Sequence, residues 1–398
     1  MKKKKILVVS QLPKEAGGTY TTGIARVIEN IYQKDFGEGL ELYWYFTNVP
    51  EKIACTKCTF NNQYNGYKMM PLQMAWNYIC HPIKTIKEWM HYKRIDGVNP
   101  LRYDFYKANF MEVLKKIKPD LIHLHGAGVS PLYYANLKTK IPFLITFHGV
   151  MYNKEDKSSW HFKSGYLATM QMVDYFTVLN QETMRKALSL GMPEDKCTVI
   201  PNGVDSSRFY FSEEQRKNLR IKYKVVGDTL VFLTTGVVID RKGQYDFILT
   251  LESLGIDYQY WIIGKGPDEQ KIADYITEHH LELKVKMLGY VDGRELYKYL
   301  SAADVYAHVS TTEGQALSEI EAYATGLRVI VRKEIAGTVI GNVKTDTDNY
   351  YVLDMNAIDN DGLKKWLNNG ISSRISRGKF DWSEIARQYG DLYKSLLS

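Results

Sequence analysis

Long apolar runs are missing from the start of the chain. After the basic MKKKK stretch, only five residues, ILVVS at 6–10, precede polar and proline positions. A membrane-spanning helix needs about 20 apolar residues, and the apolar core of a secretory signal about 7 or more. We therefore expect neither feature here, and we interpret this segment as the first β-strand of a cytoplasmic protein.

Cysteine is also scarce, with 4 residues among 398. This number predicts a reducing compartment rather than a disulfide framework. Cys55 and Cys58 form a single C-x-x-C, and Cys80 stands next to His81. A zinc site of irregular spacing is one alternative, but no second C-x-x-C exists and two adjacent residues cannot easily face one ion. Ordinary thiols are the expected state, and we predict no metal site.

Low-complexity tracts and short repeats are absent as well, and a hydrophobic content of 45% excludes a disordered chain. The chain is too long for one ordinary core, which predicts two domains or possibly three. Short β-rich runs alternate with helical stretches up to residue 200, and the pattern begins again after PNGVD. Near-continuous apolar strands are typical of parallel sheets covered on both faces. We expect an α/β fold of two Rossmann-like, doubly wound domains, over 1–204 and 205–381, and an amphipathic helix at about 382–398.

Charge is unevenly placed in a chain of net charge +7. Between Lys68 and Lys118, ten Lys or Arg stand against four acids. The same region carries apolar residues at helical spacing, interrupted at Pro82: Leu72, Trp76, Ile79, Ile83, Ile86 and Met90. Such a segment is suited to an anionic membrane surface. The alternative is a helical excursion that packs on its own domain with solvated lysines. We expect no nucleic-acid partner.

In doubly wound sheets, ligands bind at the carboxyl ends of the strands, and with two such halves the expected site is the cleft between them. The loop after the first strand contains Gly17, Gly18 and Gly23, which would let the backbone approach an anion. This spacing is not G-x-G-x-x-G, and Thr47 with Asn48 replaces the carboxylate expected after the second strand, so the sequence disfavours a nicotinamide or flavin site. A purely structural turn stays open for the glycines.

Three histidines lie at the ends of neighbouring predicted strands. His123 and His125 alternate onto one face of the third strand, and His148 ends the fourth. As neutral imidazoles they would exchange hydrogen bonds with a polyhydroxylated ligand. The other interpretation of each one is an ordinary packed or loop histidine.

The second half repeats this placement of polar groups after strands. Arg241 and Lys242 follow its first strand, where cations would meet phosphate. Glycine turns follow the next two strands, with Gly264 and Gly266 in IIGKGP and with Gly289 before Tyr290 in LGYVD.

The segment TTEGQALSEIEAYATG, at 311–326, holds the most informative pair of residues. Glu321 falls on the apolar seam of a predicted helix, and Glu313 stands just before that helix. If the helix begins near Gln315, its free N–H groups lie between the two carboxylates, a suitable place for a diphosphate. Alternatively, Glu321 caps a helix that begins near Ser318, because both fit the S/T-x-x-E/Q pattern.

These residues resemble the retaining GT-B glycosyltransferases of family 4. The similar segments are the glycine loop at 17 and 18, VIPNGVD at 199–205, IIGKGP at 262–267, LGYVD at 288–292 and 301–326 with its E-x7-E spacing. The resemblance implies that Glu313 lies against the donor sugar, that Glu321 takes the ribose hydroxyls, and that the last helix crosses back to the first domain. It further implies that the diphosphate is held by backbone amides and by Lys242, and that His148 touches the donor sugar. The donor-binding set is Gly17, Gly18, Gly264, Gly289, Tyr290, Gly314, Gln315, Ala316, Leu317 and Glu321, with His125 and Thr19 on the acceptor side.

The sequence departs from the family pattern at three points. Val237 replaces an arginine that usually stands five residues before the lysine, Val309 replaces a proline, and Gln315-Ala316 replaces Phe-Gly. Arg241 is the candidate substitute for the missing cation.

The predicted function is the transfer of a hexosyl or N-acetylhexosaminyl group, with retention and without a metal or other cofactor. We favour a UDP-sugar as donor and expect a saccharide, lipid-linked saccharide or protein glycan as acceptor, in polysaccharide biosynthesis. The alternatives are a catalytically weak scaffold subunit of a glycan assembly, and a nucleotide-sugar epimerase or hydrolase.

Overall fold

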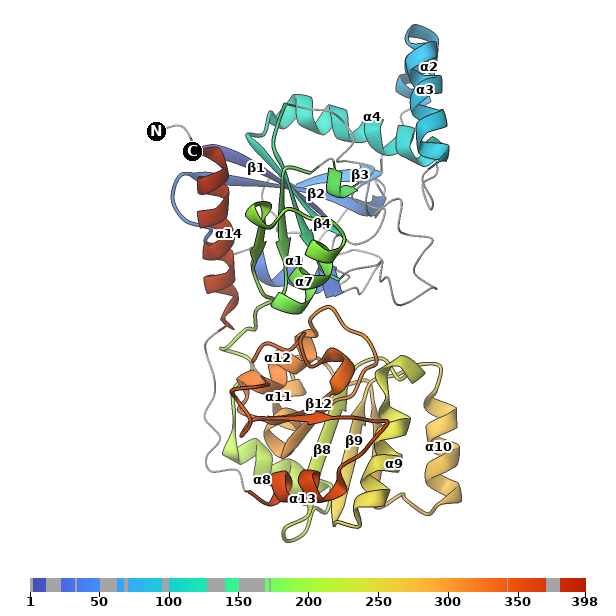
Figure 1. Cartoon of the computed structure of the whole chain (residues 1–398), viewed down its shortest axis with the longest axis vertical. Coiled ribbons are helices and arrows are strands. Elements are labelled where there is room, and N and C mark those ends of the chain that lie inside the picture. The colour runs from blue at the N-terminus through green and yellow to red at the C-terminus, as the bar shows by residue number, and fades with distance from the viewer. Residues whose placement is uncertain are drawn as a thin grey trace. The chain divides into compact units, whose positions relative to one another are not determined.

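The computed structural model describes residues 3–11, 23–32, 34–50, 63–67, 71–94, 100–126, 140–149, 169–171, 173–341, 343–369 and 380–398. Its contacts divide the chain into two compact units. Unit 1 comprises Met1–Pro201 and Trp382–Ser398, and unit 2 comprises Asn202–Asp381. Each unit is an α/β domain around one parallel sheet (Figure 1).

Unit 1 contains a sheet of seven strands in the order β3-β2-β1-β4-β5-β6-β7, with neighbours parallel. The strands are β1 (Lys4–Ser10), β2 (Leu40–Pro50), β3 (Gln63–Tyr67), β4 (Leu121–Gly126), β5 (Phe143–Phe147), β6 (Tyr175–Val178) and β7 (Cys197–Val199). Its helices are α1 (Gly23–Ile31), α2 (Pro71–Cys80), α3 (Pro82–Lys93), α4 (Pro100–Ile117), α7 (Gln181–Ser189) and α14 (Trp382–Leu397).

Unit 2 contains six parallel strands in the order β10-β9-β8-β11-β12-β13. The strands are β8 (Leu230–Thr235), β9 (Tyr258–Ile263), β10 (Val285–Gly289), β11 (Val305–His308), β12 (Arg328–Arg332) and β13 (Tyr350–Leu353). The helices are α8 (Glu213–Lys222), α9 (Gln244–Leu254), α10 (Glu269–Glu278), α11 (Leu296–Ala302), α12 (Leu317–Ala324) and α13 (Asn360–Asn368).

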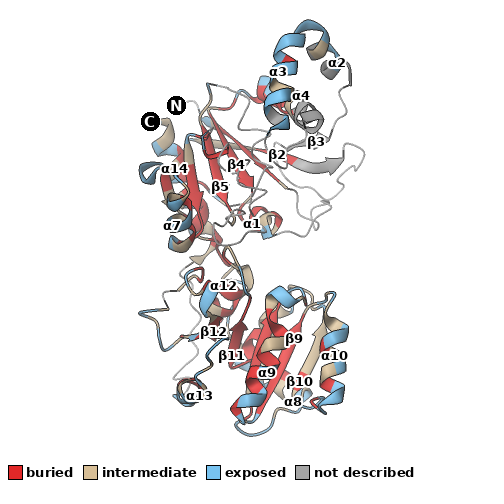
Figure 2. Cartoon of the chain, turned by 45° about the vertical axis from the view of Figure 1, so that its right-hand side comes forward, coloured by how far each residue is buried: buried red, intermediate tan, exposed pale blue. Residues whose placement is uncertain are grey.

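The strands are apolar because the sheets are covered on both faces. Positions in β1, β5, β8 and β9 are almost all buried, and the strands of both sheets are largely red in Figure 2. The predicted α/β class with two doubly wound halves is therefore confirmed. In each sheet the winding direction reverses next to the first strand, between β1 and β4 and between β8 and β11. Ligands bind at such switch points.

Helix α14, the last helix of the chain, packs within unit 1. Its Gly390 lies so close to the backbone of Phe36 that an added Cβ would be 1.7 Å from the Phe36 carbonyl oxygen. Tyr393, further along α14, stacks on the Phe36 ring with centroids 6.1 Å apart. The small residue and the aromatic contact together hold this helix against the loop before β2.

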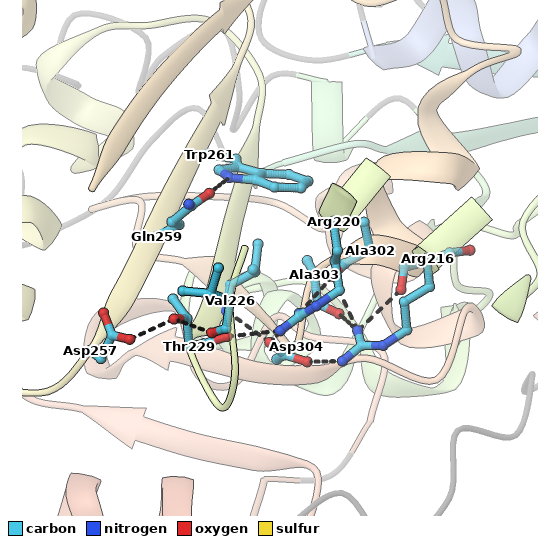
Figure 3. A network of polar contacts seen from close by, with 12 residues as sticks. Arg216, Arg220, Val226, Thr229, Asp257, Gln259, Trp261, Ala302, Ala303 and Asp304 are labelled. Atoms are coloured by element: carbon cyan, nitrogen blue, oxygen red, sulfur yellow. Dashed lines mark hydrogen bonds and ion pairs between the residues drawn. The ribbon is translucent and has the colours of Figure 1, made fainter. Parts of the chain in front are cut away.

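The amino edge of the unit 2 sheet is held by a buried charge network (Figure 3). Asp304 accepts bonds from Arg216 at 2.5 Å, from Arg220 at 2.9 Å and from the Val231 amide at 2.8 Å. Burial raises the pKa of Asp304, but the two arginines outweigh burial, so its pKa lies below the ordinary value. Since these groups satisfy one another, the network fixes α8 to β8 and β11.

Candidate active site

The loops after β8 and β11 meet at the switch point of unit 2. The Thr311 amide donates to the Arg241 carbonyl at 2.9 Å, and the Arg241 guanidinium donates to the Thr312 carbonyl at 3.0 Å. Gly243 approaches the other loop so closely that an added Cβ would be 2.3 Å from the Val309 carbonyl oxygen. The sheet topology therefore brings two loops together that lie about 70 residues apart in the sequence.

Glu313 forms an ion pair with both predicted phosphate cations. The Lys242 Nζ lies 2.5 Å from Glu313 Oε1, and an Arg241 nitrogen lies 3.5 Å from the same oxygen. The side chains of Lys242 and Glu313 are mostly buried, whereas Arg241 is about half exposed. A bound anion would therefore share or displace Glu313 as the partner of these cations.

The electrostatics of this group keep Glu313 ionised. Burial raises the pKa of Glu313, but the Lys242 ammonium and the hydrogen bonds from Lys242 and Ser310 together lower it further, so its pKa lies below the ordinary value. Burial lowers the pKa of the neighbouring His308 to about 4, so this imidazole is neutral at pH 7. The positive charge of the group thus belongs to Lys242 and Arg241.

Helix α12 begins at Leu317, two residues after the predicted start. Ala316 is its N-cap, and no side-chain hydrogen bond caps the helix. This start lies one residue before the Ser318 start of the alternative interpretation, and the capping role of Glu321 stays a prediction. Leu317, the first residue of α12, is four residues after Glu313, so the free N–H groups of the helix start follow the carboxylate that pairs with the two cations.

Gln315 connects two loops of unit 2. Its Oε1 accepts from the Asn202 amide at 2.7 Å, and its carbonyl accepts from the Asn202 side chain at 3.2 Å. Asn202 belongs to the PNGVD segment, so these bonds fix the chain just before α12. The observed role of Gln315 is therefore to position the loop before α12.

Glu321 is buried as the seam of apolar residues predicts, together with Ile320 and Ala324. Burial raises the pKa of Tyr306 to about 12, and the nearby Glu321 carboxylate adds to this shift. The Tyr306 hydroxyl lies 3.1 Å from the Thr235 hydroxyl at the end of β8. Glu321 therefore lies beside a buried polar group at the carboxyl end of the sheet.

Glycine is required where β9 ends. Gly264 has φ of +137°, and an added Cβ would be 1.7 Å from the Gly236 carbonyl oxygen. An added Cβ on Gly266 would be 2.1 Å from the Val238 carbonyl oxygen. These two glycines let the loop after β9 pack on the loop after β8. Further along, Gly289 ends β10 and Tyr290 is exposed.

Val237, at the position of the missing arginine, is an exposed side chain. Its carbonyl accepts a bond from the side-chain amide of Gln244 at 3.0 Å, which ties this loop to the first residue of α9. An arginine here would extend from the loop after β8, on the same loop as Arg241. Substitution of Arg241 for the missing cation stays a prediction.

The predicted histidine group of unit 1 is present. His123 bonds to the Tyr393 hydroxyl at 2.6 Å and to the Thr146 hydroxyl at 2.7 Å. His125 Nδ1 lies 3.0 Å from His148 Nε2. Burial lowers the pKa of His123 to about 3 and that of His148 to about 4, and it also lowers the pKa of His125. The three rings are neutral at pH 7, and His123 serves to hold α14.

Some predicted residues lie outside the described part of the chain. These are Gly17, Gly18 and Thr19, together with Cys55 and Cys58 of the zinc alternative. In the described ranges, no group of three or more His, Cys, Asp or Glu side chains could hold a metal ion. Of the remaining cysteines, Cys80 is exposed and Cys197 is buried.

Two Asp-x-Asp sequences, at 346–348 and 359–361, have structural uses. Asp346 accepts a bond from the Tyr323 hydroxyl at 2.9 Å, and Asp359 caps α13 by accepting from the Gly362 amide at 2.9 Å. One aspartate of each sequence is therefore engaged in a structural bond, Asp346 with a tyrosine hydroxyl and Asp359 as a helix cap.

A second carboxyl group of α12 was missed by sequence reasoning. Glu319 is fully buried, and it accepts bonds from the Tyr350 hydroxyl at 2.6 Å and the Ile340 amide at 3.2 Å. Burial raises the pKa of Glu319 to about 7. Its partners lie 31 and 21 residues further along the chain, so only tertiary structure reveals them.

Two protein-family models match the chain. The model described as Glycosyltransferase Family 4 matches residues 84–208, and the model described as Glycosyl transferases group 1 matches residues 215–377. Together the two models cover most of both units. The chain therefore belongs to the GT-B glycosyltransferases of family 4.

Two curated proteins with similar sequences are named as a glycosyltransferase and a glycolipid synthase. The chain is 25% identical over 341 residues to an uncharacterised glycosyltransferase of Methanocaldococcus jannaschii, covering 76% of this chain and 86% of that protein. It is 24% identical over 255 residues to an alpha-monoglucosyldiacylglycerol synthase of Acholeplasma laidlawii, covering 58% and 63% respectively.

Solved structures share the fold. HepE of Anabaena, crystallised with UDP, has a TM-score of 0.70 at 15% identity and covers 98% of this chain and 100% of its own. A glycosyltransferase of Rickettsia africae has a TM-score of 0.70 at 17% identity, with 100% and 99% covered. At these identities the comparison defines the GT-B architecture.

Proposed function

We propose that unit 2 binds a nucleoside diphosphate sugar and that the chain transfers its sugar to a hydroxyl acceptor. The observation that carries this proposal is the meeting of Lys242, Arg241 and Glu313 beside the start of α12 at the switch point. A diphosphate needs positive charge and N–H donors, and this place combines both. The UDP complex of HepE, a structural neighbour, supports UDP as the nucleotide.

The chemistry follows from where charge develops. In the transition state, the bond between the anomeric carbon and the diphosphate oxygen breaks, and negative charge grows on the diphosphate. Lys242, Arg241 and the α12 amides would stabilise that charge more than the ground state, so no metal ion is needed. The acceptor oxygen bonds to the anomeric carbon on the same face, and its proton passes to the leaving phosphate. The configuration is therefore retained.

The proposed contacts follow the predicted roles. Glu313 would hold the sugar and Glu321 the ribose, with Gly264, Gly289 and Tyr290 in neighbouring loops. His148 would contact the donor sugar, and His125 with Gly17, Gly18 and Thr19 would form the acceptor side of unit 1. Because the cations pair with Glu313 in the described structure, donor binding would loosen that ion pair.

The sugar transferred would be a hexose or an N-acetylhexosamine, and the acceptor a growing polysaccharide or a lipid-linked saccharide. The names of several relatives support this class. They include a colanic acid biosynthesis glycosyltransferase of Escherichia coli and a galactosyltransferase of the same organism that acts on a diphosphoundecaprenol-linked sugar. A cytoplasmic enzyme at the inner membrane face fits such an acceptor. Over the described residues, the structure has no helix that combines the length and the apolar character needed to cross a bilayer.

A second candidate is a catalytically weak subunit with the same fold, which Val237 favours because it removes one cation from the loop after β8.

The test is a panel of UDP-, GDP- and ADP-sugars, scored by thermal shift and by released nucleotide, with and without saccharide and lipid acceptors. We expect one donor to stabilise the wild type and to release nucleotide when an acceptor is present. Glu313→Gln should abolish release, whereas Glu334→Gln, which replaces an exposed carboxylate paired with Arg332, should not. Donor binding without turnover would favour the weak subunit, and turnover without any acceptor would favour a hydrolase or epimerase.

A further inference from the structure

Helices α2 and α3 of unit 1 expose a row of large apolar side chains. The row consists of Trp76, Ile79, Ile83, Ile86 and Met90, spaced three and four residues apart and between 45% and 73% exposed. We call these five residues the apolar row. Most exposed apolar side chains occur singly, whereas a contiguous set marks a binding surface. In Figure 2, much of α3 is coloured as exposed.

The other face of α3 is occupied by unit 1 itself. Thr85 is buried, and Glu88 forms an ion pair of 2.6 Å with Lys107 of α4. Helix α3 therefore has a defined inner side on α4, and its Ile83, Ile86 and Met90 are exposed outside that side. Helix α3 therefore packs on its own domain with solvated lysines, as one of the two interpretations of the sequence expected, and the apolar row is exposed beside that contact.

Charge decides which partner fits this surface. The segment 71–94 contains four Lys or Arg, namely Lys84, Lys87, Lys93 and Arg94, and each is exposed. Glu88 is the only acid of the segment, and Lys107 already neutralises it. The exposed surface of α2 and α3 thus combines the apolar row with four lysine and arginine side chains that no acid of the segment neutralises. A second copy of the chain would bring like charges face to face, which disfavours self-association.

We propose that the apolar row enters the interface of an anionic lipid bilayer while the four cations bind lipid phosphates. Apolar and aromatic side chains bury at the boundary of headgroups and acyl chains, and long basic side chains extend to the headgroups. Each cation near an anionic surface adds to the attraction, which salt weakens. This surface lies outside the donor site of unit 2, so the inference does not depend on the proposed function.

The test is flotation of the full-length chain with vesicles of phosphatidylcholine, alone or with phosphatidylglycerol. We expect the wild type to float with the anionic vesicles and to remain behind with the neutral ones. Ile83→Asn/Ile86→Asn should weaken partitioning by about tenfold or more. Lys84→Glu/Lys87→Glu should also weaken partitioning into anionic vesicles, and the remaining partitioning should no longer depend on salt concentration. The matched control is Ile221→Asn, since Ile221 is 77% exposed on α8 between Arg220 and Lys222.

A second readout uses the exposed thiol of Cys80, which is next to Ile79 in the sequence. In a Cys55→Ser/Cys58→Ser background, an environment-sensitive dye on Cys80 should shift to the blue only with anionic vesicles. Unchanged melting temperatures of the variants confirm folding, because the replaced side chains are exposed. Failure of the wild type to float would overturn the proposal, as would equal loss in Ile221→Asn. It would also be overturned if the Ile83/Ile86 variant changed the sedimentation coefficient without vesicles, because the row would then join two copies.

Discussion

Replacement of Lys242 by Met tests the charge arrangement of the site in two ways. The variant removes the ammonium that lies 2.5 Å from Glu313 and keeps a side chain of similar length. Loss of one preorganised donor to a developing anion costs about 10²–10³ in turnover, or about 3–4 kcal/mol of transition-state stabilisation. We therefore expect nucleotide release to fall by that factor, with a smaller change in donor affinity.

The same variant leaves a mostly buried carboxylate with a weaker set of partners. A hydrogen bond to a charged group contributes about 1.5–3 kcal/mol, so the free energy of unfolding should fall by about 2 kcal/mol at pH 7. Lys242 lowers the pKa of Glu313, so the ion pair stabilises the fold above the ordinary value of 4.5. The difference between wild type and variant should consequently shrink as the pH falls through and below that value.

Two controls separate these effects. Lys333→Met removes an equally short ion pair, 2.7 Å to Asp354, but an exposed one, and should change neither activity nor stability measurably. Lys242→Met/Glu313→Gln should recover stability without recovering activity, because no unpaired carboxylate remains. Urea unfolding and nucleotide release measure the two quantities. A folded Lys242→Met with turnover within a few fold of the wild type would refute the reasoning.

Three further variants test other parts of the structure. Because the Glu319 pKa is about 7 in the fold and 4.5 when unperturbed, the free energy of unfolding of the wild type should fall as the pH rises from 4.5 to 7, by up to about 3 kcal/mol. In urea unfolding, Glu319→Gln should lose this pH dependence, and an unchanged dependence would contradict the role of Glu319. Tyr393→Phe leaves the buried His123 without its 2.6 Å bond and should cost about 1–3 kcal/mol, more than the control Tyr389→Phe, whose bond to Thr146 is 3.3 Å long; equal melting temperatures would count against this. Arg241→Ala should lower turnover about tenfold or more, and Val237→Arg should restore part of it; no rescue would mean that the two positions are not alternatives.

Most of the fold could be predicted from the sequence because strand periodicity is a local property. The apolar strands ILVVS, LIHLH and FLITF correspond to β1, β4 and β5, and TLVFLTT to β8. The clustering of the histidines also followed from local information, since parallel strands end at one edge of a sheet. Strand β3, at Gln63–Tyr67, had no such signal because its sequence, QYNGY, is polar.

The details of the site needed tertiary structure. Sequence placed Lys242 and Glu313 after two different predicted strands but did not show that those strands are neighbours or that the two side chains pair directly. Gln315 was assigned to the donor from the family resemblance, and its bonds to Asn202 arise from a loop 113 residues away. Glu319 resembled an ordinary helix surface residue, because its partners Tyr350 and Ile340 are brought in by β13 and the preceding loop.

The most direct measurement is a crystal structure of the chain with a nucleoside diphosphate bound. The account predicts phosphate oxygens within hydrogen-bond distance of the first α12 amides and of Lys242, with Glu321 bonded to the ribose hydroxyls. A diphosphate bound elsewhere in unit 2, or one that leaves the pair of Lys242 and Glu313 untouched and far from its oxygens, would contradict it.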